Sequence, residues 1–259
     1  MAPVPKRFLS YAVLLEADGN HGSGFFYSDR TSLFLVSAKH VLFKNKLEIY
    51  KTPLRMSSID ADEDNSRLSY ELDCQTLFTD GNLRKHATAD VAAVRIASLN
   101  LDNTIYKVAE VPGVTGDAPL DTWSLIGMFE EDAIRLDDIE VGTDVLLIGY
   151  PTSLADPDLF EKSTPLLRAG IVAGMANDAH IVIDCPVYFG NSGGLVLAKL
   201  PDVEEHKAIG IASRMVPFQE KLFSKEFQVQ VGIRYENSGY AIVEPMDRVF
   251  ELLADFAVP

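Results

Sequence analysis

The chain alternates between short apolar runs and turn-forming residues. The runs are rich in β-branched and aromatic residues, and Gly, Pro, Asn or Asp often separates them, which is typical of strands joined by turns. Helical periodicity is nearly absent from the first half. The runs fall at 9–17, 23–28, 32–38, 46–52, 68–74 and 90–97 in the first half, and at 144–150, 168–173, 179–185, 194–199, 207–213, 227–234 and 239–243 in the second. The pattern predicts an all-β protein with two β-rich halves.

A long connection separates the two halves. From 106 to 140 the sequence contains several Pro, Gly and Asp residues and an acidic patch at Glu130-Glu131-Asp132. We therefore expect an N-terminal unit over 1–105, a connection over 106–140 and a C-terminal unit over 141–259. One clear helix is expected at the end of the chain, packed on the second unit. It follows Pro245, with apolar residues at helical spacing at Met246, Val249, Phe250, Leu252, Leu253 and Phe256.

Charge and composition narrow the classes of function. The 259 residues include 23 Lys and Arg against 38 Asp and Glu, so the formal net charge is −15, which disfavours nucleic acid and anionic membranes as partners. Charged residues interrupt every apolar stretch before it reaches the roughly 18 residues of a membrane span. The segment after Lys6 and Arg7 lacks a signal-peptide cleavage site, so no targeting segment is expected. With only Cys74 and Cys185, no disulfide framework is expected, and we predict a soluble cytoplasmic protein with reduced thiols.

The most specific local pattern is Gly190-Asn191-Ser192-Gly193-Gly194, which lies between two strand-like runs. Ser192 is a candidate nucleophile, which needs a base to take its proton and donors to stabilise an oxyanion. Glycines suit the second need, because they let backbone N–H groups turn toward a substrate carbonyl. Taken alone, such a motif is more often a glycine-rich hairpin turn.

Two further residues supply the missing chemistry. His40 follows the apolar run 33–36, and an imidazole at a strand end is a candidate general base because its pKa is near neutral. Asp90 directly precedes the apolar run 91–94, where its partly buried carboxylate needs a donor, and the Nδ1–H of a histidine is an obvious one. Each residue has a plain alternative: a structural histidine at a strand end, and an aspartate that ends a turn.

Taken together, these segments resemble the chymotrypsin clan of serine peptidases. The segments GSGF at 22–25, SAKHVL at 37–42, ADVAAVRI at 89–96 and GNSGG at 190–194 follow the order His, Asp, Ser of that clan. Three others are similar to the high-temperature-requirement branch and related bacterial trypsin-like peptidases: VGTDVLLIGYP at 141–151, AGIV at 169–172 and GYAI at 239–242. The resemblance spans nearly the whole chain, from about 22 to 256.

The resemblance implies a fold and a set of roles. The fold is two six-stranded antiparallel β-barrels with the active site between them, the first barrel carrying His40 and Asp90 and the second Ser192. His40 would be the general base, Asp90 the carboxylate that orients it and Ser192 the nucleophile, with the N–H groups of Gly190 and Ser192 as the oxyanion hole. The substrate-binding residues implied by position are Pro186, Val187, Tyr188, Ser213, Arg214 and Met215. No carboxylate is among them, so we expect cleavage after small or medium aliphatic residues rather than after Lys or Arg.

Several features depart from the family pattern. Asn191 stands where zymogen-activated members carry an acidic residue, and no internal Ile-Val-Gly-Gly segment is present, so activation by N-terminal cleavage is not expected. We expect no PDZ domain after the terminal helix, and hence no regulation through one. Tyr188 and Phe189 precede the oxyanion glycine, where bulky side chains could shape the cleft or hold an inactive loop.

The leading functional hypothesis is a serine endopeptidase that hydrolyses peptide bonds through an acyl-enzyme, acting on protein or peptide substrates without a cofactor or metal. The alternative is a catalytically silent pseudoprotease that binds peptides or partner proteins in the same cleft; the intact set His40, Asp90 and Ser192 favours the enzyme. The acidic segment Asp60-Ala61-Asp62-Glu63-Asp64-Asn65 imitates a calcium loop, but Asn65 stands where glycine is required. We interpret it as a solvated loop.

Overall fold

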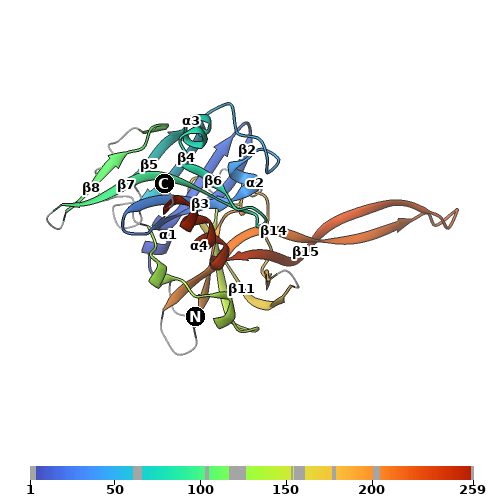
Figure 1. Cartoon of the computed structure of the whole chain (residues 1–259). Coiled ribbons are helices and arrows are strands. Elements are labelled where there is room, and N and C mark those ends of the chain that lie inside the picture. Colours follow the sequence, from blue (N-terminus) through green and yellow to red (C-terminus); the bar gives the residue numbers. More distant parts are fainter. Residues whose placement is uncertain are drawn as a thin grey trace.

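The computed structural model describes residues 4–60, 66–102, 105–116, 127–152, 154, 161–176, 179–200 and 205–257. Within these ranges the chain forms two antiparallel sheets and a few short helices (Figure 1). This confirms the all-β, double-barrel class predicted from the sequence. None of the helices in the described ranges is long and apolar enough to cross a membrane.

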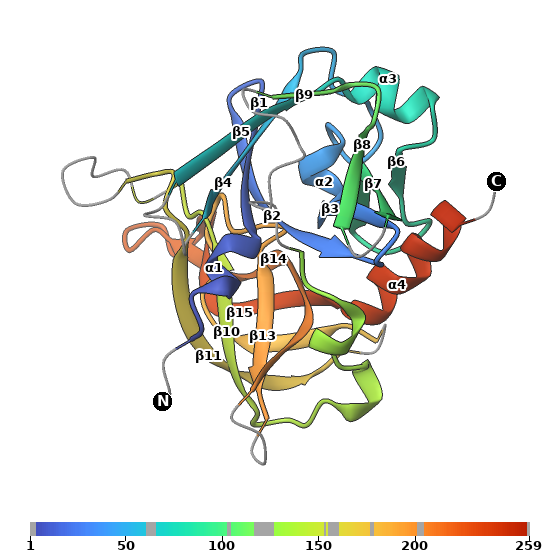
Figure 2. The same cartoon turned by 90° about the vertical axis from the view of Figure 1, so that its left-hand side faces the viewer.

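Within the described ranges the first sheet contains nine strands, where the family resemblance implied six. Its order is β6-β7-β3-β2-β1-β4-β5-β9, and β8 pairs with β7 (Figure 2). The additional strands include β8 and β9, which lie in the region expected to be a connection. The bounds are β1 Ala12–Ala17, β2 Asn20–Ser28, β3 Ser32–Ala38, β4 Leu54–Asp60, β5 Ser66–Leu72, β6 Leu83–Lys85, β7 Val91–Asp102, β8 Ile105–Glu110 and β9 Val114–Gly116.

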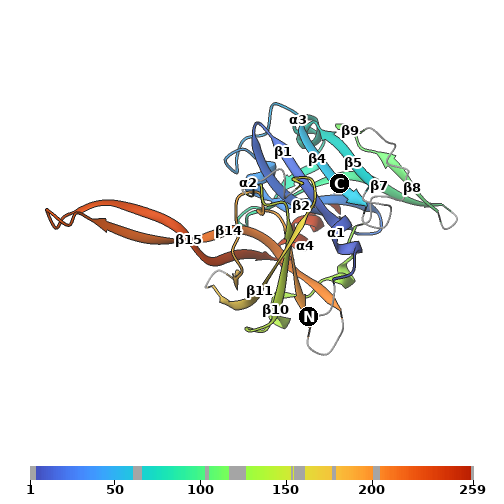
Figure 3. The same ribbon diagram turned by 180° about the vertical axis from the view of Figure 1, so that it is seen from behind.

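The second sheet closes into a six-stranded barrel. Its order is β10-β11-β12-β15-β14-β13, with every neighbouring pair antiparallel. The predicted run 207–213 is part of the longer strand β14, and the two predicted runs 227–234 and 239–243 both fall largely within the single strand β15. The far ends of β14 and β15 leave the barrel as a two-stranded projection (Figures 1 and 3). The bounds are β10 Asp144–Gly149, β11 Leu166–Met175, β12 Ile181–Asp184, β13 Leu195–Lys199, β14 His206–Phe223 and β15 Gln230–Pro245.

The helices are short. The α-helices are α1 Arg7–Tyr11, α2 Lys39–Leu42, α3 Cys74–Thr79 and α4 Met246–Ala254, and 3₁₀ turns span Glu130–Asp132, Leu136–Asp138 and Asp255–Ala257. The predicted terminal helix is confirmed as α4. It packs against both sheets rather than the second alone, because Val249 and Leu252 share one apolar cluster with Phe34 of β3 and Leu146 of β10. This shared cluster holds the two sheets together and so fixes the residues of one sheet relative to those of the other.

The strand predicted over 46–52 is wrong. Asn45 and Lys46 both have left-handed backbone, with φ of 53° and 66°, and two such residues in succession cannot continue a strand. Leu47 is 74% exposed, so the apolar residues of this run do not share a buried face. The next strand, β4, begins only at Leu54.

Candidate active site

The position of His40 is set by the junction of β3 and α2. β3 ends at Ala38, and the chain enters α2 with the Lys39 N–H donating to the Asp90 carbonyl at 3.1 Å. The neighbouring Val41 and Leu42 are buried in the first sheet, so the short helix is anchored on its apolar side. His40 therefore lies in the first turn of a helix directly after the strand.

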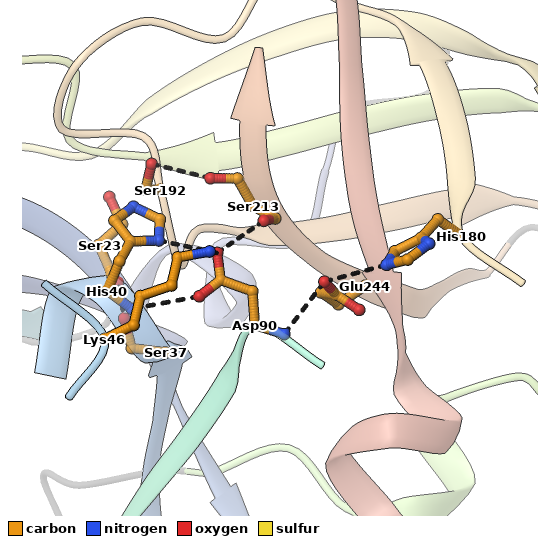
Figure 4. Close-up of polar contacts among 9 residues, drawn as sticks. All are labelled: Ser23, Ser37, His40, Lys46, Asp90, His180, Ser192, Ser213 and Glu244. Carbon is orange, nitrogen blue, oxygen red and sulfur yellow. Dashed lines mark hydrogen bonds and ion pairs between the residues drawn. The ribbon is translucent and has the colours of Figure 1, made fainter. Parts of the chain in front are cut away.

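Asp90 directly precedes β7 and is 5% exposed. Its Oδ2 accepts from His40 Nδ1 at 2.8 Å and from the Ser213 hydroxyl at 2.8 Å, and its Oδ1 accepts from the His40 backbone N–H at 3.2 Å (Figure 4). Lys46 Nζ lies 3.3 Å from Oδ2. Burial raises the pKa of Asp90, but the hydrogen bonds from His40 and Ser213 and the charges of His40 and Lys46 outweigh it and hold this pKa well below its usual range. Asp90 is therefore ionised and fixed at neutral pH.

Ser192 lies on a tight turn between β12 and β13. The Asn191 N–H donates to the Tyr188 carbonyl at 3.0 Å, and Gly190 has a φ of 94°, the combination found in a type II turn. A Cβ at Gly190 would clash with the Tyr150 carbonyl. Glycine is thus required at this position by both its φ and its close backbone neighbour.

The first sheet holds this turn directly through Ser23 of β2. The Ser23 N–H donates to the Ser192 carbonyl at 2.8 Å, and its hydroxyl donates to the Gly190 carbonyl at 2.6 Å while accepting from the Tyr150 N–H at 2.8 Å. With the carbonyls of Gly190 and Ser192 engaged in this way, no acceptor among the described residues takes the N–H of either one. Two backbone donors of the turn therefore remain available.

The Ser192 hydroxyl does not bond to the imidazole in this structure. Its Oγ donates to the Ser213 carbonyl at 3.1 Å, and within the described part of the chain no hydrogen bond joins it to His40 Nε2 (Figure 4). Ser213 thus accepts from Ser192 through its backbone and donates to Asp90 through its hydroxyl. The structure brings His40, Asp90, Ser192 and Ser213 together at one place, where the two sheets meet.

A cavity of about 570 Å³ opens in front of these residues. Its lining includes His40, Ser192, Gly190 and Phe189 together with five of the predicted substrate-binding residues: Val187, Tyr188, Ser213, Arg214 and Met215. Pro186, the sixth predicted substrate-binding residue, is not among the lining residues. Beyond His40, the cavity is also lined by Val41, Tyr50 and Leu54, which lie on the side of the first sheet. The cavity therefore extends on both sides of Ser192.

Sequence reasoning missed two residues near Asp90. Glu244 of β15 is buried, and its Oε1 accepts the Asp90 backbone N–H at 3.1 Å and lies 3.2 Å from His180 Nε2 (Figure 4). Lys46 reaches Asp90 from the left-handed turn after α2. The only sequence signal for Glu244 is an acidic residue directly after the apolar run 240–243, and Lys46 has none because its contact depends on the turn.

A comparison with protein-family models gives the family. The model for the trypsin-like peptidase domain matches residues 22–211. The chain belongs to the trypsin-like peptidase family. This match covers the segments of His40, Asp90 and Ser192, and it makes the chain a serine endopeptidase by class. No curated protein sequence matches this peptidase.

Solved structures agree on the fold of the peptidase. A serine endoprotease from Yersinia pestis is 14% identical with a TM-score of 0.53, over 98% of this chain and 67% of that one. The HtrA-type protease AlgW with tripeptide is 16% identical with a TM-score of 0.56, over 98% of this chain and 64% of the other. Deg5 is 17% identical with a TM-score of 0.50, over 96% and 90%. The peptidase thus spans about two thirds of the first two chains.

Three further predictions concern the two cysteines, metal binding and the acidic segment at 60–65. Cys74 and Cys185 are both free and buried, and burial raises the pKa of each thiol to about 11, which disfavours the reactive thiolate form of both. Within the described ranges, no group of three or more His, Cys, Asp or Glu residues is arranged to hold a metal ion. The acidic segment once weighed as a calcium loop lies mostly at 61–65, outside the described residues.

Proposed function

We propose that this peptidase cleaves peptide bonds with Ser192 as nucleophile, His40 as general base and Asp90 as the carboxylate that orients His40. The observation that carries the proposal is the 2.8 Å contact between His40 Nδ1 and buried Asp90, together with the fact that His40 and Ser192 line the same cavity. An ionised Asp90 at this distance keeps the proton of the imidazole on Nδ1. The Nε2 lone pair is then free to accept the proton of a serine.

Hydrolysis would follow two steps at this site. Ser192 Oγ attacks the substrate carbonyl carbon while its proton passes to His40 Nε2, and the imidazolium then gives that proton to the leaving amine as the peptide bond breaks. Water, deprotonated by the same imidazole, then releases the acyl group and restores the serine. The free N–H groups of Gly190 and Ser192 would stabilise the oxyanion in both steps. Ser192 must first turn from the Ser213 carbonyl to His40, and such catalytic contacts are often incomplete before substrate binds.

One observation supports a second candidate. Because the Ser192 hydroxyl donates to the Ser213 carbonyl and not to His40, the site is also compatible with a pseudoprotease that binds peptides without cleaving them. In that case the cavity and the strand edge at Ser213 would still hold an extended peptide, but the serine would stay unreactive.

Covalent labelling by a fluorophosphonate separates the two candidates. The enzyme should label at Ser192 in a time-dependent way, and Ser192→Ala should not label although its circular dichroism spectrum is unchanged. Heat-denatured wild type controls for non-specific reaction. If the folded wild type does not label but still binds peptides, the result would support the pseudoprotease instead.

The cavity also supports a substrate preference. None of the described residues that line it is an Asp or Glu, whereas Lys44 and Arg214 are both present. A substrate Lys or Arg buried there would lack a charge partner, so we infer a preference for small or medium aliphatic residues before the cleaved bond. Selectivity should be graded, at about 1–3 kcal/mol per methylene. A peptide library analysed by mass spectrometry tests this, and dominant cleavage after Lys or Arg would contradict it.

We also propose that the protein acts in a reducing compartment such as the cytoplasm. The support is that both of its cysteines are buried as free thiols, 111 positions apart in sequence (185 − 74). Fractionation of cells that express the full-length protein would test the location.

A further inference from the structure

Asp90 is held by hydrogen bonds from both sides of the site. On the side of the first sheet, its carbonyl accepts the Lys39 N–H at 3.1 Å and its Oδ1 accepts the His40 N–H at 3.2 Å. From the second sheet, Ser213 of β14 donates to Oδ2 at 2.8 Å, and Glu244 of β15 accepts the Asp90 N–H at 3.1 Å (Figure 4). Among the described residues, Glu244 is the only acceptor of this N–H.

Glu244 is buried to an extent that is unusual for a carboxylate. It is 1% exposed and directly follows the apolar run 240–243. Within the described ranges its Oε2 is buried without a hydrogen-bond partner, which costs free energy. Its Oε1 makes the contacts that offset this cost, with the Asp90 N–H and with His180 Nε2 at 3.2 Å. An apolar side chain would fill this core position at lower cost, so the contacts of Oε1 explain the carboxylate.

The loop that precedes Asp90 does not hold it by itself. The two N–H groups before Asp90 are satisfied inside the loop, because His86 Nδ1 accepts from the Thr88 N–H at 3.2 Å and from the Ala89 N–H at 2.9 Å. The Asp90 N–H is the next one along the chain, and its acceptor comes from the other sheet. The backbone position of Asp90 relative to the second sheet therefore depends on Glu244.

The position of Asp90 in turn determines the orientation of His40. Asp90 Oδ2 reaches His40 Nδ1 at 2.8 Å and accepts the Ser213 hydroxyl at the same time. Hydrogen bonds weaken steeply when their geometry is poor. A misplacement of about 1 Å in a catalytic arrangement can cost about 100-fold in rate. A displaced Asp90 backbone would therefore also displace the imidazole of His40.

We propose that Glu244 is a positioning residue for catalysis, whose Oε1 fixes the backbone of Asp90 so that the Asp90 carboxylate meets His40 Nδ1. This role rests on the proposed function, in which His40 is the general base. Glu244 does not line the cavity in front of Ser192, so it acts through Asp90 and not on the substrate. His180 Nε2, at 3.2 Å from the same Oε1, helps to keep this oxygen in place.

A double-mutant cycle on one fluorogenic peptide tests the proposal. Glu244→Ala should lower kcat about 30-fold and change KM less than about twofold, because Glu244 does not contact the substrate. Glu244→Gln should keep kcat within about threefold of wild type, because its amide oxygen can still accept the Asp90 N–H. In the Asp90→Asn background, Glu244→Ala should change kcat less than about threefold, because the carboxylate that it positions is already absent. Ser192→Ala gives the background rate.

Two further measurements separate positioning from a general loss of stability. Val172→Ala removes buried methyl groups from the core of the second barrel and should leave kcat within about twofold of wild type, although the protein is less stable. Circular dichroism melts show that each variant is folded at the assay temperature. Proton NMR follows the His40 Nδ1–H without any need for activity. Wild type and Glu244→Gln should show its downfield resonance, and Glu244→Ala should lose it through faster exchange with water.

Several outcomes would overturn the proposal. One is a folded Glu244→Ala protein whose kcat stays within about threefold of wild type. Another is a loss that multiplies with that of Asp90→Asn, because Glu244 would then act independently of Asp90. Equal losses in Glu244→Ala and Glu244→Gln would show that the acceptor oxygen is irrelevant. If wild type hydrolyses no peptide, the proposed function fails; the NMR resonance then decides alone, and its retention in Glu244→Ala overturns the positioning role as well.

Discussion

Asp90→Asn is the most informative single change at the proposed site. The amide nitrogen must replace either Oδ1, which accepts the His40 backbone N–H at 3.2 Å, or Oδ2, which faces His40 Nδ1, Ser213 Oγ and Lys46 Nζ. The backbone N–H cannot change its role. At Oδ2 all three partners can adjust: the imidazole changes tautomer, the Ser213 hydroxyl turns, and the half-exposed Lys46 moves away. The amide nitrogen should therefore take the Oδ2 position.

The substitution therefore stabilises the wrong tautomer of His40. With an N–H donor opposite it, Nδ1 must accept, so the imidazole proton moves to Nε2. Nε2 then has no lone pair for the proton of Ser192, and the general base is lost without any loss of packing. We expect kcat to fall by about 10⁴, as in other triads of this type, which corresponds to about 5.4 kcal/mol of transition-state stabilisation.

The assay compares kcat of wild type, Asp90→Asn and Lys46→Met on one fluorogenic peptide with an aliphatic residue before the cleaved bond. Lys46→Met is the matched control, because it removes a partner of Oδ2 but leaves the tautomer of His40 unchanged; its kcat should stay within about tenfold, since a half-exposed ion pair is worth little. An Asp90→Asn protein that is folded and keeps kcat within tenfold of wild type would remove Asp90 from the proposed triad.

Three further predictions test the same arrangement. Ser192→Ala should abolish hydrolysis with the fold intact, and adding His40→Ala should cause little further loss in kcat, so losses that multiply would argue that the two residues act separately. Glu244→Ala should lower the free energy of unfolding by about 1–3 kcal/mol in denaturant melts, because the backbone N–H of Asp90 loses the buried acceptor that it contacts at 3.1 Å. Glu244→Gln should cost less, because its amide oxygen can still accept from this N–H. Equal losses of stability in the two variants would contradict this role of Glu244. The native pKa of Asp90 lies below the unfolded value of about 3.9, so its ionised form stabilises the fold above about pH 4, and this contribution disappears as the pH falls toward the native pKa. Wild type should therefore lose more stability than Asp90→Asn between pH 6 and pH 2, and parallel losses would show that Asp90 is not the group that titrates.

Most of the strands and the terminal helix could be predicted because each of these has a local signal. Alternating or continuous apolar runs gave most strands of both sheets, and Pro245 with its helical spacing gave α4. The helices α1 and α3 were missed because five and six residues are too few for periodicity to show. A weaker signal for α3 was present: Asp73 accepts from the N–H groups of Gln75 and Thr76, as an N-cap aspartate does.

The full length of β14 and β15 could not be predicted for a different reason. Residues 216–238 pair only with each other. Apolar residues alternate over 227–235, which predicts the run 227–234, but the sequence shows no such alternation over 216–223 and no turn signal at the edge of the barrel. Pro217 adds to the difficulty, since proline usually argues against a strand interior. It is tolerated here because β14 has no described neighbour on its other side at this point.

At the site, residue identities were available from the sequence, whereas their relative positions were not. His40 and Asp90 belong to the first sheet and Ser192 to the second, so only contacts between the sheets can bring them together. Ser23 makes the most direct of these contacts. It lies on β2, and its backbone N–H and its hydroxyl hold the carbonyls of Ser192 and Gly190.

The same serine links the nucleophile turn to the strand that carries His40. The Ser23 carbonyl accepts the hydroxyl of Ser37 on β3 at 2.6 Å, and β3 runs directly into α2, where His40 lies. A Cβ at Gly193 would clash with both the Ser23 carbonyl and the Ser37 hydroxyl, so the turn can approach β2 and β3 this closely only with glycine at that position. Gly190 and Gly193 are the two glycines of the motif at 190–194 that have positive φ. Gly193 allows the contact between the sheets, whereas Gly190 allows the turn itself. A motif interpreted from sequence as a single oxyanion loop therefore combines two physical requirements, and the second is visible only when the partner strands are in place.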